Sequence, residues 1–274
     1  MHPDFESVDI GRRNLRYLCR GAGRFTVVLE QGQGDSVEEG FSQRVAVGWP
    51  KVCLALQGMA RTFVYDRAGL GWSDKAPEPR TSRDLASDLR AVLQTLRISP
   101  PYILVGHSIG GFTVRHYANS FPNEVGGVVL VDSAHPDQQA RLSPLLPPPP
   151  PPPRREKLEL HCLRPNPREP LPGGVDFASS AEQIRALRSL GNLPVTVVRR
   201  GFKPIVATGL APHDAETIER VWAELQSDLL GVSMNSSLVS AEGAGHDIPR
   251  HAPEVVIDAI SGMIERAART PMLS

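Results

Sequence analysis

A serine between two glycines is the first group in this chain that could do chemistry. The segment GHSIG (106–110) matches the pattern G-x-S-x-G, and it follows an apolar run and precedes a helix-like pattern. That context indicates a nucleophile elbow, a strained strand-to-helix turn that holds a serine hydroxyl clear of a sheet. The amide of Ile109 would then face the place where negative charge develops in acyl transfer. Ser108 is the candidate nucleophile, and an ordinary turn serine is the alternative.

A serine hydroxyl needs a base, and the chain contains eight histidines. His246 lies in a glycine-bracketed loop, GAGH, between the last apolar run and the last helical pattern. The loop at the carboxyl end of a parallel strand is where a base could meet Ser108. His251 is the rival, although its place at the start of a helix favours capping or exposure. His107 is expected to point elsewhere, and His116 to be packed or solvated.

The imidazole in turn needs a carboxylate to orient it. Asp132 ends the apolar run GVVLVD and lies between Ser108 and His246, in the order Ser, Asp, His. After the next strand pattern the first acid is Asp214, which is also a candidate helix N-cap. Asp132 is the preferred acid, and Asp214 and Asp228 remain alternatives.

Short aliphatic runs alternate with longer amphipathic stretches along the chain. Nearly continuous aliphatic runs are typical of strands buried on both faces of a parallel sheet. Residues 81–96 predict an amphipathic helix with Thr81 or Ser82 as N-cap. The alternation predicts an α/β fold with helices on both faces of a mostly parallel sheet. The strand patterns are 26–30, 61–65, 102–106, 127–132, 195–199 and 237–241, and further helices are expected over 109–121, 179–190, 215–230 and 253–269.

Residues 134–193 break this alternation. They contain no strand pattern, and seven consecutive prolines run from Pro147 to Pro153. We expect 1–133 and 194–274 to form the core domain and 134–193 to be a proline-rich insertion. The insertion could be a stiff surface linker or a cap over the active site, and the proline run could also dock a partner domain.

Composition limits the class of protein. The 274 residues include 30 basic and 30 acidic side chains, which gives no electrostatic case for nucleic acid or an anionic membrane surface. Three widely spaced cysteines form neither a disulfide framework nor a metal-ligand pattern. The first residues lack a signal-peptide profile, and no apolar run is long enough to span a membrane. A cytoplasmic protein is the expectation.

The chain resembles the alpha/beta-hydrolase superfamily, in its branch of cofactor-free, carboxylesterase-like serine hydrolases. Besides GHSIG and GAGH, the segments YDRAGLGWSD (65–74) and VLVDSAHPD (129–137) carry the resemblance, which is weakest over 134–193. It implies an eight-stranded, mostly parallel sheet with a cap inserted after the sixth strand. It also implies that Ser108 is the nucleophile and His246 the base.

The resemblance assigns the oxyanion hole as well. The turn Gln31-Gly32-Gln33 corresponds to the family's His-Gly-x turn, so the amides of Gln33 and Ile109 would form the hole. Gln31 replaces the usual histidine. No acid follows the seventh strand directly, but haloalkane dehalogenases place theirs after the sixth, as Asp132 would be. Those enzymes and epoxide hydrolases use an aspartate nucleophile, and Ser108 argues against both reactions.

These residues predict an esterase that acts on small or medium acyl chains and needs no metal or organic cofactor. The same triad could serve carbon–carbon bond hydrolysis, lactone opening, acyl transfer or perhydrolysis, and a non-catalytic receptor is a further alternative. The expected partner is a small ester, and the sequence does not indicate the oligomeric state. Four aromatic residues are expected to pack against the sheet or, alternatively, to line a pocket: Trp49, Trp72, Phe112 and Trp222.

Overall fold

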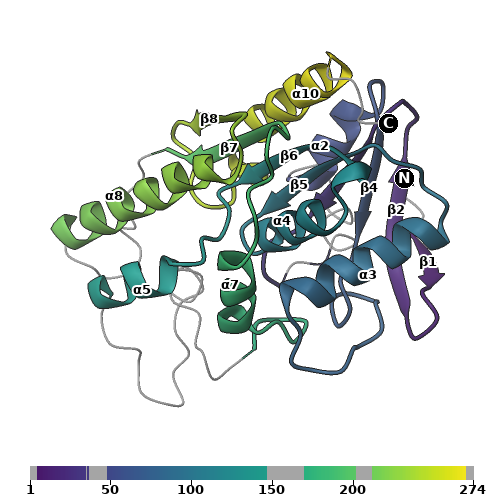
Figure 1. The fold of residues 1–274 in the computed structure, drawn as a ribbon, viewed down its shortest axis with the longest axis horizontal. Helices are drawn as coiled ribbons and strands as arrows, with labels where there is room; N and C mark the ends of the chain where they lie inside the picture. Colours follow the sequence, from purple (N-terminus) through teal and green to yellow (C-terminus); the bar gives the residue numbers. More distant parts are fainter. Residues whose placement is uncertain (1–4, 35, 37–47, 147–169, 202–211, 270–274) are drawn as a thin grey trace.

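The computed structural model describes residues 5–34, 36, 48–146, 170–201 and 212–269 (Figure 1). Within them, eight strands form one sheet in the order β1-β2-β4-β3-β5-β6-β7-β8. β2 pairs antiparallel with β1 and β4, and every other neighbouring pair is parallel. The expected eight-stranded, mostly parallel sheet is confirmed. The strands are β1 Glu6–Asp9, β2 Asn14–Arg20, β3 Thr26–Glu30, β4 Arg61–Tyr65, β5 Tyr102–His107, β6 Val125–Val131, β7 Val195–Arg200 and β8 Ser236–Ala241.

Helices cover both faces of the sheet (Figure 1). α3 and α4 lie against one face, where α4 packs on β5 and α3 packs beside α4, and α2 and α10 lie against the other. Every residue of the central strands β3 and β5 is buried, as their aliphatic sequences require. The helices are α2 Trp49–Leu56, α3 Ser82–Thr95, α4 Gly110–Ser120, α5 Gln138–Leu142, α7 Phe177–Arg185, α8 Pro212–Asp228, α9 Ile248–His251 and α10 Pro253–Arg269.

The expected helix over 81–96 begins where its capping residues predict. Thr81 is the N-cap, and its backbone N–H donates to Asp84 Oδ2 at 2.7 Å, which is half of a capping box. None of the helices in the described part of the chain is both long and apolar enough to cross a membrane.

The described part of residues 134–193 contacts the helices beside the sheet through α7. α7 packs its apolar side, including Phe177 and Ile184, against α3 and α4. The Ser82 backbone N–H donates to Ser180 Oγ at 3.0 Å, and Gln183 Oε1 accepts from the Arg83 N–H at 3.2 Å. The Pro147–Pro153 run lies outside the described residues. These contacts therefore hold α7 beside α4, the helix that follows Ser108.

Candidate active site

The elbow is built from β5, Ser108 and α4. Ser108 lies between them with a backbone φ of 52°, a strained value for any residue but glycine. A Cβ at Gly106 would lie 2.7 Å from the Gly110 carbonyl oxygen, and a Cβ at Gly110 would lie 2.6 Å from the Gln31 carbonyl oxygen. Only glycine fits at these two positions, so the pattern around Ser108 follows from close packing.

One imidazole links the three candidate catalytic side chains. His246 Nε2 lies 2.9 Å from Ser108 Oγ, and His246 Nδ1 lies 2.6 Å from Asp132 Oδ2. The side chain of His246 is 29% exposed, whereas that of Asp132 is fully buried. Solvent and substrate can therefore reach the histidine but not the carboxylate. The order serine, imidazole, carboxylate is the arrangement in which a base activates a hydroxyl.

The Asp132 carboxylate accepts from three further donors. Its Oδ1 accepts from the Arg200 backbone N–H at 3.1 Å and from Trp222 Nε1 at 2.9 Å. Its Oδ2 accepts from Arg200 Nη1 at 3.2 Å. Burial alone would raise the pKa of Asp132, but Arg200, His246 and Trp222 together hold that pKa below its usual value. The carboxylate is therefore ionised at neutral pH and fixed in orientation.

His107 contacts the loop that carries the base. Its Nε2 lies 2.9 Å from the His246 carbonyl oxygen, which can only accept, so Nε2 carries the hydrogen. Burial and the neighbouring His246 lower the pKa of His107 to about 4, so this ring is neutral at physiological pH. We expected His107 to point elsewhere, whereas it ties the end of β5 to the backbone of the base.

The turn 31–33 lies against the elbow and is held by an arginine. Arg67 Nη1 donates to the Gln31 carbonyl at 2.7 Å, and Nη2 donates to the Gly32 carbonyl at 2.6 Å. Arg67 also pairs with the buried Glu30 at 2.8 Å. A Cβ at Gly32 would lie 3.4 Å from the Cβ of Ser108, so the turn and the nucleophile are in contact range. The Gln31 and Gly32 carbonyls thus point to Arg67, which fixes the backbone of this turn beside Ser108.

The alternative residues lie elsewhere. Asp214 is exposed in the first turn of α8, and Asp228 pairs with Arg141 at 3.2 Å. His251 is exposed at the end of α9. Among the described side chains, His246 Nδ1 has its carboxylate partner in Asp132.

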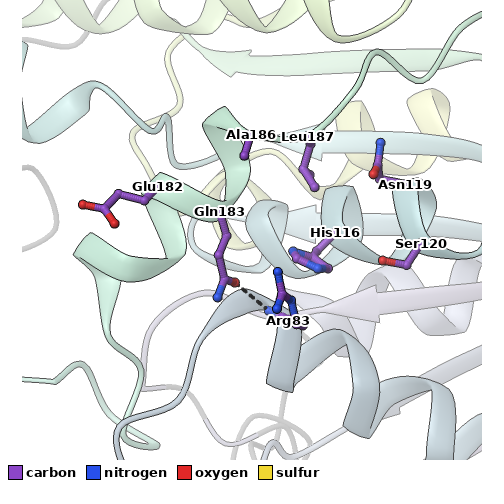
Figure 2. Close-up of a pocket in the computed structure, with 8 residues that line it drawn as sticks. All are labelled: Arg83, His116, Asn119, Ser120, Glu182, Gln183, Ala186 and Leu187. Atoms are coloured by element: carbon purple, nitrogen blue, oxygen red, sulfur yellow. Dashed lines mark hydrogen bonds between the residues drawn. The ribbon is translucent and has the colours of Figure 1, made fainter.

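A separate hollow of about 520 Å³ lies between α3, α4 and α7 (Figure 2). Among the residues lining it is His116, whose Nδ1 lies 3.4 Å from Ser82 Oγ. His116 is six residues beyond Gly110 on α4, roughly 9 Å at 1.5 Å per residue. This hollow is therefore not formed by the Ser108 cluster.

Sequence reasoning missed the partners of Asp132. Arg200 is a charged residue at the end of a buried strand. Trp222 lies on α8 three residues after Glu219, whose carboxylate pairs with Arg200 at 2.9 Å, so Glu219 and Trp222 share a helix face. A charged residue at the end of a buried strand and this spacing on α8 were the features of the sequence that could have indicated these contacts. Trp222 also packs edge-on to His246, with centroids 5.9 Å apart, whereas Trp72 is 77% exposed and does not pack on the sheet as expected.

The described residues contain no cluster of three or more His, Cys, Asp or Glu side chains suited to a metal ion. The groups of this site that can act chemically are the serine, the imidazole and the carboxylate. Together they can transfer a proton away from Ser108 and stabilise the resulting imidazolium.

Residues 26–157 match a family model described as the alpha/beta hydrolase fold. The protein YqjL of Bacillus subtilis is 25% identical to this chain over an alignment that covers 88% of this chain and 84% of YqjL. The 2-(acetamidomethylene)succinate hydrolase of Mesorhizobium japonicum is 25% identical over 94% of both chains. The structure of alpha/beta hydrolase domain-containing protein 10 from mouse matches with a TM-score of 0.65 at 17% identity, over 96% of this chain and 99% of that one. Its sheet order, its elbow and these similarities show that this chain has the alpha/beta-hydrolase fold.

Proposed function

We propose that this protein is a serine hydrolase that cleaves carboxylic esters of small to medium acyl chains through an acyl-enzyme intermediate. One observation carries the proposal: the His246 ring lies between Ser108 Oγ at 2.9 Å and Asp132 Oδ2 at 2.6 Å. A hydroxyl in that position has a base for its proton, and the base has a carboxylate for its charge.

In the first half-reaction, Ser108 Oγ bonds to the ester carbonyl carbon while His246 Nε2 takes the hydroxyl proton. The carbonyl oxygen becomes an oxyanion, which the amides of Ile109 and Gln33 stabilise. Loss of one such donor typically costs ~10²–10³ in rate. When the bond to the alcohol oxygen breaks, His246 returns the proton to that alcohol.

In the second half-reaction, water takes the place of the alcohol. His246 removes a proton from the water, whose oxygen attacks the acyl carbon. The bond to Ser108 Oγ then breaks, the serine regains its proton and the carboxylic acid leaves. Asp132 stays ionised throughout and stabilises the imidazolium in both halves.

The insertion 134–193 is the proposed cap, with the core formed by 1–133 and 194–274. Its helices α5 and α7 follow the strand end that carries Asp132, and α7 is docked on α3 and α4 beyond the elbow. Loops at this edge of an α/β sheet determine substrate preference. Substitutions in this segment are therefore expected to change the preferred acyl length.

The test combines covalent labelling with turnover. The purified protein is incubated with a fluorophosphonate probe, the adduct is located by peptide mass mapping, and p-nitrophenyl esters from acetate to palmitate are assayed. We expect the label on Ser108 and turnover of the shorter esters. Ser108→Ala should lose both, and Ser87→Ala, an exposed serine on α3, should lose neither.

Labelling of Ser108 without ester turnover would move the substrate to another bond type. The dicarboxylate in the name of the Mesorhizobium relative is the first compound to add to the assay in that case. Absence of labelling, or full activity in Ser108→Ala, would overturn the proposal.

A further inference from the structure

A second pair of charges lies behind the candidate acid. Arg200 Nε and Nη2 donate to the two carboxylate oxygens of Glu219 at 3.0 and 2.9 Å, and Nη1 donates to Asp132 at 3.2 Å. The side chains of Arg200 and Glu219 are 6% and 3% exposed. The planar guanidinium therefore bridges two buried carboxylates, one of which contacts His246.

The bridge addresses two opposed requirements of a buried acid. Burial disfavours the ionised form of Asp132, and a neighbouring cation restores it. A lone cation would also oppose the imidazolium that His246 must become. Because Glu219 neutralises Arg200, the pair adds no net charge, and His246 still faces the negative charge of Asp132.

Arg200 also helps to fix the orientation of the Asp132 carboxylate. Asp132 has a backbone φ of 36°, so its side chain leaves the end of β6 from a strained position. The Arg200 amide and the Trp222 indole both hold Oδ1. Oδ2 is then the oxygen that remains for His246 Nδ1.

We propose that Arg200 is a positioning residue of the reaction, which acts through Asp132 by keeping it ionised and aimed at His246, and that Glu219 balances the charge of Arg200. The inference rests on the proposed function, in which Asp132 is the acid. The inference gives the end of β7 a defined role, because Arg200 there supplies the cation for Asp132, which follows the neighbouring strand β6.

Other charged groups face this cluster from neighbouring elements. His107, at the end of β5, bonds to the His246 carbonyl and is neutral above its pKa of about 4. Asp247 follows His246 in the same loop and acts electrostatically on His107. Both are present in every variant below, so they do not alter the comparison.

The test measures the pH dependence of fluorophosphonate inactivation and of p-nitrophenyl acetate kcat/KM. Arg200→Gln removes a positive charge, so the cluster binds a proton more tightly and the acid limb moves to higher pH by about one unit or more. Glu219→Gln removes a negative charge, so the limb moves to lower pH. The double variant should return the limb close to that of the wild type.

Arg200→Lys separates charge from geometry. The lysine keeps the positive charge, so the acid limb should stay in place. It cannot make the bidentate pair with Glu219 and also donate to Asp132, so kcat should fall while KM changes little. The control is Arg90→Gln, which breaks the pair between Arg90 on α3 and Glu124 in the turn before β6. This pair touches no residue of the site, so its loss should leave the profile unchanged. Circular dichroism at each pH shows which variants are folded, and Glu219→Gln and the double variant serve if Arg200→Gln is not.

The outcomes separate the two proposals. A wild-type protein that neither labels nor turns over esters overturns the proposed function, and this inference with it. A wild type that reacts, with Arg200→Gln and Glu219→Gln variants whose acid limbs stay in place or move in the same direction, overturns this inference alone. A uniform loss of rate at all pH values in those two variants would assign Arg200 and Glu219 a merely structural role.

Discussion

At the scale of single residues, surroundings decide which carboxylate can serve His246. Asp132 is buried beside a cation and two N–H donors, whereas Asp214 is exposed on the first turn of α8. A buried, oriented carboxylate holds one tautomer of its histidine and stabilises the imidazolium, which a mobile surface acid cannot do. The two residues are therefore expected to respond very differently to the same substitution.

Asp132→Asn should lower kcat by ~10⁴, because an amide N–H facing His246 Nδ1 favours the wrong tautomer. Asp214→Asn should stay within about twofold of the wild type, since surface substitutions away from buried features have small effects. The measurement is p-nitrophenyl acetate turnover, with folding checked by near-UV circular dichroism. The reverse ranking would transfer the role of acid to Asp214.

Arg67 is expected to affect both stability and rate. Arg67→Met leaves Glu30 buried without its partner, which costs about 3–5 kcal/mol of unfolding free energy. It also frees the carbonyls of Gln31 and Gly32, so the turn that contains the proposed oxyanion donor Gln33 loses its support and kcat should fall. Urea unfolding and ester turnover measure the two effects.

The double variant Arg67→Met/Glu30→Leu separates them. It removes both buried charges, so much of the unfolding free energy should return, while kcat should remain low because the carbonyls of the turn are still unbound. Recovery of kcat together with stability would show that Arg67 only balances Glu30.

At the scale of elements, the elbow depends on how closely β5 approaches α4. Gly106→Ala places a Cβ 2.7 Å from both the Gly110 carbonyl oxygen and Val114 Cγ2, and overpacking of this kind costs ~1–3 kcal/mol. Gly262 on α10 has no atom within 4 Å of its Cβ position, so Gly262→Ala should stabilise by ~0.5–1 kcal/mol. Thermal unfolding should therefore shift in opposite directions, and a higher Tm for Gly106→Ala would contradict the packing argument.

The sheet was predictable where a strand is buried on both faces. The aliphatic patterns at 26–30 and 102–106 became β3 and β5, with β5 one residue longer. β1 and β2 were not predicted, because Glu6–Asp9 and Asn14–Arg20 carry charged residues and are only partly buried. β1 is the edge strand and pairs with β2, whose other neighbour, β4, lies far along the chain.

The candidate site was also predictable only in part, where its residues lie in a local sequence motif. Ser108 and His246 could be named from local sequence, because an elbow and a strand-end loop are local features. The contacts of Asp132 with Arg200 and Trp222 join β6, β7 and α8, so they exist only after the sheet is assembled. The helix expected over 179–190 runs from Phe177 to Arg185, and the segment after it still contacts α4, because Asn119 Nδ2 donates to the Arg188 carbonyl at 3.0 Å.

At the scale of the whole molecule, buried neutral histidines make stability depend on pH. Burial and His246 lower the pKa of His107 to about 4, and burial foremost lowers that of His135 to about 4. Unfolded histidines titrate near 6.5. Between those values the unfolded chain binds protons that the folded chain does not, so stability falls as the pH falls from about 6.5 to 4. Asp132, with its lowered pKa, loses its contribution only below about 4 and does not act in this window.

From pH 7 to pH 5, each of these two histidines should remove about 2 kcal/mol from the free energy of unfolding. His135→Asn keeps an acceptor for the Asp137 backbone N–H, which His135 Nδ1 accepts at 3.1 Å, but it cannot take up the proton. The variant should therefore lose about 2 kcal/mol less than the wild type between the two pH values. Burial also lowers the pKa of His116, which acts with the same sign in both proteins. Urea unfolding at each pH measures the difference, and equal losses in the two proteins would mean that His135 does not resist protonation in the folded chain.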